Sequence, residues 1–216
     1  MLSIAFDCDG TLVDSEPLHN RADVAILSQL GIVIDPDEHR HRSTGVGRAS
    51  MLRIIEQEHG VRLPPDTEER IEAELQRLVV AELQPVAAVP HVLDVLAKRG
   101  ARMAVASNSP SVYIDQALRT CGIREHFGDR ISAADRVAHL KPAPDIYLLA
   151  ADLLEAAPTH CVAVEDSLAG VIAAHAARMR TIAFCPPDHV FTPAQLTNAG
   201  AAHVISDFRQ LLDIVG

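Results

Sequence analysis

Short apolar runs that alternate with helix-like stretches form the main pattern of the chain beyond residue 86. Each run ends in polar or turn-forming residues, which is typical of buried strands in a parallel sheet. Because the strands and helices alternate, the pattern predicts βαβ units and an α/β fold. The expected strands are residues 2–6, 103–106, 131–133, 161–164, 181–184 and 204–205, and the expected helices are residues 90–98, 112–121, 142–154 and 167–177.

Residues 15–85 show a second pattern, in which apolar residues recur at helical spacing and no strand is indicated. This block interrupts the α/β pattern directly after its first strand. We therefore expect residues 1–14 and 86–216 to form the core, and residues 15–85 to form an inserted helical cap domain over the carboxyl edge of the sheet. The expected helices of the cap are residues 16–30, 51–59 and 66–83.

Two acidic residues, Asp7 and Asp9, follow the first expected strand. Side chains at positions i and i+2 of an extended segment point the same way, so both carboxylates can face one point beyond the sheet. Ligands of open α/β sheets bind at that edge. Gly10 permits backbone angles closed to other residues, and Thr11 adds a small hydroxyl. The alternative is that the acids only cap the following helix.

Small polar residues and a lysine mark two further positions. Ser107 and Asn108 end the second expected strand, where a hydroxyl, an amide and backbone donors suit an anionic oxygen, although both are also ordinary helix caps. Lys141 precedes Pro142 at the expected start of a helix. A lysine there is unfavourable against the helix dipole, which indicates a phosphate-neutralising charge. The alternative is a solvated loop lysine.

Adjacent acids, Glu165 and Asp166, end the strand expected at residues 161–164. Two carboxylates beside two more on a neighbouring strand repel one another strongly unless a cation is shared. Hard oxygen ligands, few of them from protein, favour Mg²⁺ completed by water and a substrate phosphate. The alternative is that Asp166 caps the next helix.

The order and placement of these four segments resemble the haloacid dehalogenase-like hydrolases, most closely their β-phosphoglucomutase-like branch. The chain also looks similar to the bacterial 6-phosphogluconate phosphatases of that branch. The resemblance covers nearly the whole chain and implies a Rossmann-like core, with helices on both faces of a parallel sheet, plus an inserted all-helical cap domain. The matching segments are Asp7-Cys8-Asp9-Gly10-Thr11, Ser107-Asn108, Lys141-Pro142 and Glu165-Asp166-Ser167.

The resemblance also implies a role for each matched residue. Asp7 would be the nucleophile that forms an aspartyl phosphate, and Asp9 the general acid and then base. Mg²⁺ would be held by Asp7, the main-chain carbonyl of Asp9, and Asp166, with Glu165 supporting it directly or through other ligands. The transferring phosphoryl oxygens would be held by Ser107, Asn108 and Lys141.

Candidate specificity residues lie in the expected cap. His19 falls where the resembling sugar-phosphate mutases carry a histidine near the hinge. Residues 44–48, Thr-Gly-Val-Gly-Arg, look like their Gly-Val-Xaa-Arg segment, whose arginine, here Arg48, clamps the second phosphate of the substrate. The basic run at residues 39–42 could face the active-site cleft. For each of these features the alternative is a solvated surface position.

One departure from the mutases favours hydrolysis. They carry a cap lysine that meets the substrate, whereas residues 15–85 contain no lysine, and Arg70 or Arg77 would not be equivalent to it. We therefore expect a Mg²⁺-dependent phosphatase acting on a small phosphorylated sugar or sugar acid. The first alternative is a β-phosphoglucomutase-like hexose-phosphate mutase. The alternative of another class is a non-catalytic phospho-accepting or sugar-phosphate-sensing protein.

Composition narrows the expected partners and location. The formal net charge of -10 repels polyanions, so neither nucleic acid nor an anionic membrane is an expected partner. No apolar run reaches transmembrane length, and residues 1–6 lack the features of a secretion signal, so a cytoplasmic protein is expected. A monomer is expected because no long heptad appears. The cysteines lack paired spacing and are expected to be reduced thiols, three of them in the core: Cys8, Cys121, Cys161 and Cys185.

Overall fold

Two compact units make up the chain. The computed structural model describes residues 2–43 and 46–216, apart from the side chain of residue 41. One unit, called the sheet unit, comprises Met1–Asp14 with Gln84–Gly216, and the other, called the helical unit, comprises Ser15–Leu83. The sheet unit is therefore interrupted in sequence, after its first strand, by the helical unit.

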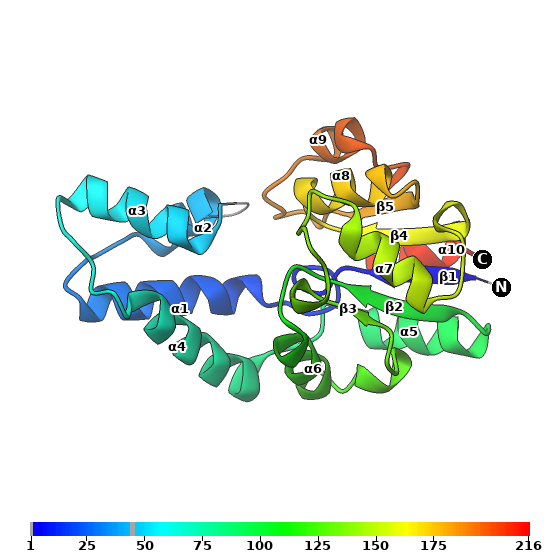
Figure 1. Cartoon of the computed structure of the whole chain (residues 1–216), viewed down its shortest axis with the longest axis horizontal. Helices are drawn as coiled ribbons and strands as arrows, with labels where there is room; N and C mark the ends of the chain where they lie inside the picture. The colour runs from blue at the N-terminus through cyan, green and yellow to red at the C-terminus, as the bar shows by residue number, and fades with distance from the viewer. Residues whose placement is uncertain (1, 44–45) are drawn as a thin grey trace. The chain divides into compact units, whose positions relative to one another are not determined.

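The sheet unit is built on a six-stranded sheet with the strand order β3-β2-β1-β4-β5-β6 (Figure 1). Every neighbouring pair of strands is parallel, which confirms the predicted α/β fold. All residues of β1 are buried, as an apolar run without alternation predicts. The strands are β1 (Ser3–Phe6), β2 (Arg102–Ala106), β3 (Ile131–Ser132), β4 (Cys161–Glu165), β5 (Arg180–Phe184) and β6 (His203–Ile205).

Helices cover both faces of this sheet, as Figure 1 shows for α7 and α8 on one face and α5 on the other. The strand order explains the two layers. The chain moves outward from β1 to β3 and then returns past β1 to β6, and right-handed crossovers place the helices of the two directions on opposite faces. The helices are α5 (Val89–Lys98), α6 (Ser111–Thr120), α7 (Asp145–Leu153), α8 (Leu168–Ala176), α9 (Pro193–Ala199) and α10 (Leu211–Ile214), with short 3₁₀ turns at Arg124–His126, Ala134–Arg136, Pro158–His160 and Phe208–Gln210.

The start of α7 differs from the prediction. The helix begins at Asp145, not at Pro142, because residues 140–143 form a turn in which Ala143 N–H donates to the carbonyl of Leu140 at 2.9 Å. The peptide bond between Lys141 and Pro142 is cis. The prediction that the lysine directly precedes a helix is therefore wrong, and the helix-dipole argument for it does not apply.

Two helices of the sheet unit, α9 and α10, have no counterpart among the predicted elements. α9 has a single buried residue, Leu196. Its start is fixed instead by a capping box, in which Thr192 Oγ1 accepts from Gln195 N–H at 3.3 Å and Gln195 Oε1 accepts from Thr192 N–H at 2.8 Å. A search for apolar periodicity does not detect a helix of this kind.

The chain leaves and re-enters the sheet unit through two segments that run side by side. Asp14 N–H donates to the carbonyl of Gln84 at 2.9 Å, and Val86 N–H donates to the carbonyl of Leu12 at 3.0 Å. Gln84 and Pro85, which the sequence pattern placed in the helical block, therefore group with the sheet unit.

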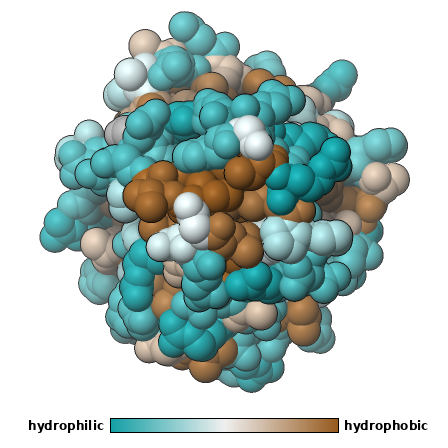
Figure 2. Space-filling view, turned by 90° about the vertical axis from the view of Figure 1, so that its left-hand side faces the viewer, coloured by the Kyte–Doolittle hydropathy of each residue, from teal (hydrophilic) through white to brown (hydrophobic). Residues whose placement is uncertain are grey.

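The helical unit has no strand among its described residues. Leu27, Ile32, Met51 and Ile55 form its buried cluster. Ile34, Leu52 and Leu63 pack against this cluster and are only partly buried. Figure 2, which views the left-hand side of Figure 1, shows an apolar area on the surface. No helix in the described part of the chain combines the length and apolarity needed to cross a membrane. The helices of the unit are α1 (Glu16–Gln29), α2 (Pro36–Ser43), α3 (Arg48–His59) and α4 (Thr67–Glu82).

The cysteines are free thiols, and three of them are buried, as expected. Cys8, Cys161 and Cys185 are buried, and Cys121 is half-buried. Burial raises the pKa of each thiol, to about 11 for Cys121. These cysteines are therefore packing residues with little thiolate character near neutral pH.

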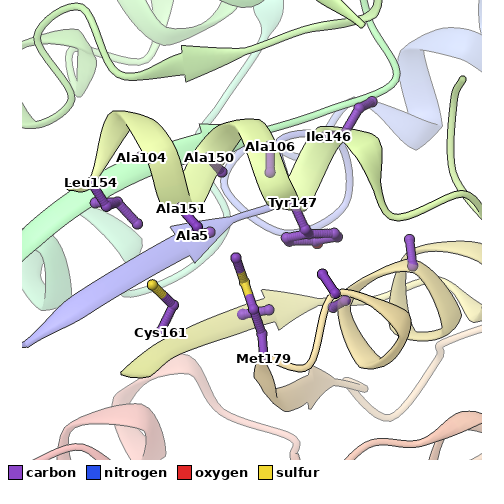
Figure 3. Close-up of a cluster of buried hydrophobic side chains, with 14 residues drawn as sticks. Ala5, Ala104, Ala106, Ile146, Tyr147, Ala150, Ala151, Leu154, Cys161 and Met179 are labelled. Atoms are coloured by element: carbon purple, nitrogen blue, oxygen red, sulfur yellow. The ribbon is translucent and has the colours of Figure 1, made fainter. Parts of the chain in front are cut away.

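Small side chains let α7 approach the sheet closely. Ala5 of β1 and Ala104 and Ala106 of β2 lie in one buried cluster with Ala150 and Ala151 of α7 (Figure 3). All five are fully buried. Because alanine has no atoms beyond Cβ, this contact contains no side chain that could rotate to make room for a larger one.

Ala150→Leu is expected to destabilise the protein. The three added carbons would enter a closely packed contact, and overpacking of this kind costs about 1–3 kcal/mol of unfolding free energy. Urea unfolding followed by circular dichroism measures the difference. Ala97→Leu, at an exposed position of α5, is the matched control and is expected to change the unfolding free energy little. Equal effects of the two substitutions would contradict the close packing described here.

Candidate active site

The predicted site segments meet at the carboxyl ends of the central strands. Phe6, the last residue of β1, pairs with Val105 of β2 and Val164 of β4. The next residue, Asp7, donates its N–H to the carbonyl of Val164 at 2.9 Å. Because the three strands end at the same level, the polar residues that follow them are gathered at one edge of the sheet.

Lys141 lies between two buried carboxylates. Its Nζ donates to Asp7 Oδ1 at 2.5 Å and to Glu165 Oε1 at 2.5 Å. The exposed fractions of the side chains are 4% for Lys141, 11% for Asp7 and 0% for Glu165. The ammonium also lies 5.0 Å from the ring centroid of Tyr147, in a cation–π contact. The structure thus brings three of the predicted residues together, and Lys141 is not a solvated loop lysine.

Burial and the neighbouring charges shift the pKa values of both Lys141 and Asp7. Burial opposes the charged form of Lys141, but the carboxylates of Asp7 and Glu165 outweigh it and raise the pKa of the lysine well above its ordinary value. Burial also raises the pKa of Asp7; Lys141 opposes this rise, and the negative charges of Glu165, Asp166 and Asp9 add to it. The carboxylates therefore outnumber the ammonium, and a bound divalent cation would relieve the excess negative charge.

Glu165 is held on both of its oxygens. Besides Lys141 on Oε1, its Oε2 accepts from the N–H of Asp166 at 2.9 Å, the N–H of Ser167 at 2.8 Å and the hydroxyl of Ser167 at 3.0 Å. Gly170 makes room for the carboxylate, because a Cβ at this position would lie 1.7 Å from Glu165 Oε1. Glu165 thus links the start of α8 to Lys141.

Asp166 packs against the loop that follows β1. Its Oδ1 accepts from Thr11 Oγ1 at 3.3 Å. A Cβ on Gly10 would lie 2.2 Å from Asp166 Oδ2, and Gly10 has a φ of 78°, so both space and backbone conformation favour glycine there. His189 Nε2 lies 3.6 Å from the same Oδ2. The first and last predicted segments are therefore in contact.

Asp9 lies in a different environment from Asp7. Its Oδ2 accepts from Ser109 Oγ at 2.8 Å, and its Oδ1 accepts from the hydroxyl of Tyr113 at 2.8 Å. Two donors to the Asp9 carboxylate are therefore neutral hydroxyls, whereas Asp7 accepts from a buried ammonium.

Ser107 and Asn108 organise the loop that follows β2. Ser107 Oγ accepts from Ser109 N–H at 3.1 Å. Asn108 Oδ1 accepts from Lys141 N–H at 2.9 Å, and its Nδ2 donates to the carbonyl of Lys141 at 3.4 Å. Asn108 therefore fixes the backbone of Lys141, and through it the position from which the ammonium reaches Asp7.

The acids and polar residues predicted as possible helix caps are not the N-caps of the helices that follow them. The N-cap of α1 is Ser15, not one of the two aspartates of the first segment. The N-cap of α6 is Pro110. α8 is capped by the hydroxyl of Ser167, which accepts from Gly170 N–H at 3.0 Å, and not by Asp166. Helix capping therefore does not account for Asp7, Asp9 and Asp166.

The donors at this edge fit Mg²⁺ by their chemistry. The carboxylates of Asp7 and Asp166 and the main-chain carbonyl of Asp9 are hard oxygen donors. Among the residues that the structure describes, no three His, Cys, Asp or Glu side chains form a group suited to hold a metal. Mg²⁺ does not require one, because it commonly binds through one or two carboxylates together with waters and substrate phosphates.

In the helical unit, the two predicted specificity residues lie together. Arg48 Nη2 lies 3.2 Å from His19 Nδ1. The same guanidinium pairs with Glu72 at 3.0 Å and with Asp23 at 3.4 Å. His39 in turn pairs with Asp23 at 3.0 Å. Arg48 is therefore partly neutralised by two carboxylates within its own unit.

Thr44 and Gly45, which begin the segment predicted to carry Arg48, lie outside the described residues, as does the side chain of residue 41. His39 is buried, so a solvated position for the basic run at residues 39–42 is wrong at this residue. The carboxylate of Asp23 explains the burial, because it supplies a partner for the imidazole ring.

Sequence reasoning missed four residues of the site region, one of which, Tyr147, lies inside a predicted helix and contacts the Lys141 ammonium. Ser109 follows two predicted site residues directly, so its position at the strand end could have indicated it. Tyr113 lies inside a predicted helix, and His189 lies in a loop after β5, so neither carries a local signal. Only the folded chain shows that they reach Asp9 and Asp166, respectively.

Comparisons with known proteins agree on one family. A sequence profile of the haloacid dehalogenase-like hydrolases matches residues 1–178. The chain is 32% identical over 188 residues to a 6-phosphogluconate phosphatase of Escherichia coli, covering 87% of this chain and 84% of that one. It is 33% identical over 193 residues to hexitol phosphatase B of the same species, and the match covers 87% of this chain and 85% of that one. A crystal structure of CbbY from Rhodobacter sphaeroides in complex with phosphate matches with a TM-score of 0.81 and 31% identity. This match covers 98% of this chain and 96% of that one.

Gly170→Ala is expected to destabilise the protein and to disturb Glu165. The added methyl group would overlap the carboxylate, so Glu165 would have to move away from Lys141 and from the start of α8. We expect a loss of roughly 1–3 kcal/mol of unfolding free energy, measured by urea unfolding. Gly47→Ala is the control, because a Cβ there would have no atom of the described residues within 4 Å. An unchanged stability of Gly170→Ala would contradict the described position of Glu165.

Proposed function

Because the chain belongs to the haloacid dehalogenase-like hydrolase family, we propose that it is a Mg²⁺-dependent phosphatase of a small phosphorylated sugar or sugar acid. Phosphoric monoester hydrolysis is the enzyme class of the named relatives. The observation that carries the proposal is the buried Lys141 ammonium between Asp7 and Glu165, at an edge where Asp9 and Asp166 also lie. This arrangement combines a nucleophile, an acid–base group and positive charge for a phosphoryl group.

In the first half-reaction, Asp7 acts as the nucleophile. One of its oxygens forms a bond to phosphorus while the bond between phosphorus and the substrate oxygen breaks. The leaving oxygen takes a proton from the carboxylic acid of Asp9, so that an alcohol departs. The products of this step are an aspartyl phosphate on Asp7, the free alcohol and an ionised Asp9.

In the second half-reaction, water attacks the aspartyl phosphate. The bond from phosphorus to the water oxygen forms, the bond to Asp7 breaks, and the water proton passes to Asp9. Phosphate leaves, and both aspartates return to their starting states. The net change is the conversion of a phosphate monoester and water into an alcohol and inorganic phosphate.

Charge neutralisation and positioning supply most of the catalysis in phosphoryl transfer. We propose that Lys141, Ser107 and Asn108 hold the phosphoryl oxygens, and that Asp7, the Asp9 carbonyl and Asp166 would hold Mg²⁺, which neutralises charge on those oxygens when bound. Glu165 supports the site through Lys141, because both of its oxygens already accept hydrogen bonds.

The names of the relatives and two residues of the helical unit support the proposed substrate class. The two phosphatases compared above are named for a sugar acid phosphate and for hexitols, and we propose that His19 and Arg48 contact the corresponding part of the substrate here. Arg48 already pairs with Glu72 and Asp23, so a second phosphate would have to compete with two carboxylates for it. Together with the absence of a lysine from residues 15–85, this favours hydrolysis over the mutase reaction, which passes through a bisphosphate.

A phosphate-release screen over sugar phosphates, sugar acid phosphates, nucleotides and glycolytic acids tests the proposal. We expect release from sugar or sugar acid monophosphates, and a loss of roughly 10³-fold or more in Asp7→Asn, which cannot form the aspartyl phosphate. Asp213→Asn, at an exposed position of α10, is the control and should keep wild-type activity. Rapid isomerisation of β-glucose 1-phosphate with a bisphosphate activator and no phosphate release would show the mutase instead.

Removal of divalent cations is expected to abolish activity. Without a cation, the excess of carboxylates around Lys141 repels the substrate phosphate and the nucleophile lacks charge compensation. Dialysis against EDTA should lower the rate of hydrolysis by roughly 100-fold or more, and Mg²⁺ should restore it. Ca²⁺ should restore little, because it is larger and takes more ligands. Full activity after complete chelation would contradict the proposed Mg²⁺ dependence.

A further inference from the structure

We propose that Tyr113 positions the carboxyl group of Asp9 for proton transfer; this inference rests on the proposed function. The tyrosine hydroxyl donates to Asp9 Oδ1 at 2.8 Å, and Ser109 Oγ donates to Oδ2 at 2.8 Å. Tyr113 does not touch the reacting atoms in this account. It acts through Asp9 and is a positioning residue.

The two hydroxyls define the rotation of the carboxyl group. The last torsion of an aspartate side chain has a broad energy minimum, so packing alone leaves the orientation of its oxygens poorly defined. At Asp9, each oxygen has its own donor, one from the loop after β2 and one from α6. Rotation of the group would break both hydrogen bonds together, so their joint effect is to hold the carboxyl group in one orientation.

The ring of Tyr113 is itself fixed. The residue is only 6% exposed and lies on the buried face of α6 with Ile114 and Ala117. The first residue of that helix, Ser111, is held by Asp135 through its N–H at 2.9 Å and its hydroxyl at 2.8 Å. Because the helix start and the ring are both anchored, the hydroxyl is presented to Asp9 without a large loss of side-chain freedom.

Hydroxyl partners suit a group that alternates between acid and base. A hydroxyl can donate to a carboxylate and can also accept from a carboxylic acid, so the contact can persist in both states. An ammonium can only donate, and it favours the ionised form. The structure gives Asp7 an ammonium donor from Lys141, and it gives Asp9 hydroxyl donors from Ser109 and Tyr113.

Tyr113→Phe tests the role kinetically, because it removes the hydroxyl and keeps the ring. With a sugar phosphate, we expect kcat to fall roughly 10- to 100-fold, a part of the usual contribution of general acid–base catalysis, with KM nearly unchanged. With p-nitrophenyl phosphate, the leaving group departs without a proton, so the first half-reaction should persist while hydrolysis of the aspartyl phosphate slows. Rapid mixing should then show a burst of about one p-nitrophenolate per enzyme.

A spectroscopic measurement tests the contact without using activity. The chain has only two tyrosines, so incorporation of 3-fluorotyrosine should give two ¹⁹F resonances, and Tyr113→Phe identifies one of them. Asp9→Ala should shift the Tyr113 resonance and leave that of Tyr147 almost unchanged. A Tyr113 resonance that does not respond to Asp9→Ala would overturn the contact.

The outcomes separate this inference from the proposed function. A wild-type enzyme that releases no phosphate from any substrate would overturn the proposed function, and the positioning role with it. An active wild type, together with Tyr113→Phe that keeps its kcat and shows no burst, would overturn the role of Tyr113 alone. Val112→Ala, at the neighbouring exposed position of α6, is the control and should match the wild type in both assays. A lower kcat in both variants would indicate a general effect of disturbing α6 and would also count against the proposal.

Discussion

The site depends on one buried ammonium shared by two carboxylates. Removing a charge from water is unfavourable unless an opposite charge and hydrogen bonds replace the lost hydration. Lys141 meets this requirement for Asp7 and Glu165 at once, and Asn108 fixes the backbone from which the lysine extends. The ends of β1 and β4 and the turn before α7 are therefore tied to one atom. This explains how acids far apart in the sequence can be buried side by side at the edge of the sheet.

The same arrangement gives two residues of one type different partners. Asp7 and Asp9 are the same residue type on one short loop, yet one has an ammonium as its partner and the other has hydroxyls. The ammonium of Lys141 favours the ionised form of Asp7 and so opposes the burial that raises the pKa of this carboxyl group. These two environments support the proposed roles of Asp7 as nucleophile and Asp9 as general acid and base. The distinction arises from the elements that surround the loop and not from the loop sequence.

Much of the fold and the location of the site could be predicted from the sequence, because both depend on local signals. Apolar runs indicate strands, and polar residues directly after them must lie at the sheet edge. The start of α7 was predicted wrongly, since Pro142 is compatible with both a first helical turn and the turn that forms here. The partners of Asp9 could not be predicted, because Tyr113 is distant in sequence and has the spacing of an ordinary buried helix residue.

The clustered carboxylates also constrain residues that carry no charge. Gly10 and Gly170 each lie where a methyl group would overlap a carboxylate, of Asp166 and Glu165 respectively. A glycine at such a position costs conformational entropy on folding, and it is retained only where another residue would cost more. Each glycine here adjoins an acid that must be held close to other elements. Gly10 is therefore explained by the close approach of Asp166 as much as by its own backbone angles. Because Asp166 is distant in sequence, the short segment from Asp7 to Thr11 carries a constraint that comes from another part of the chain.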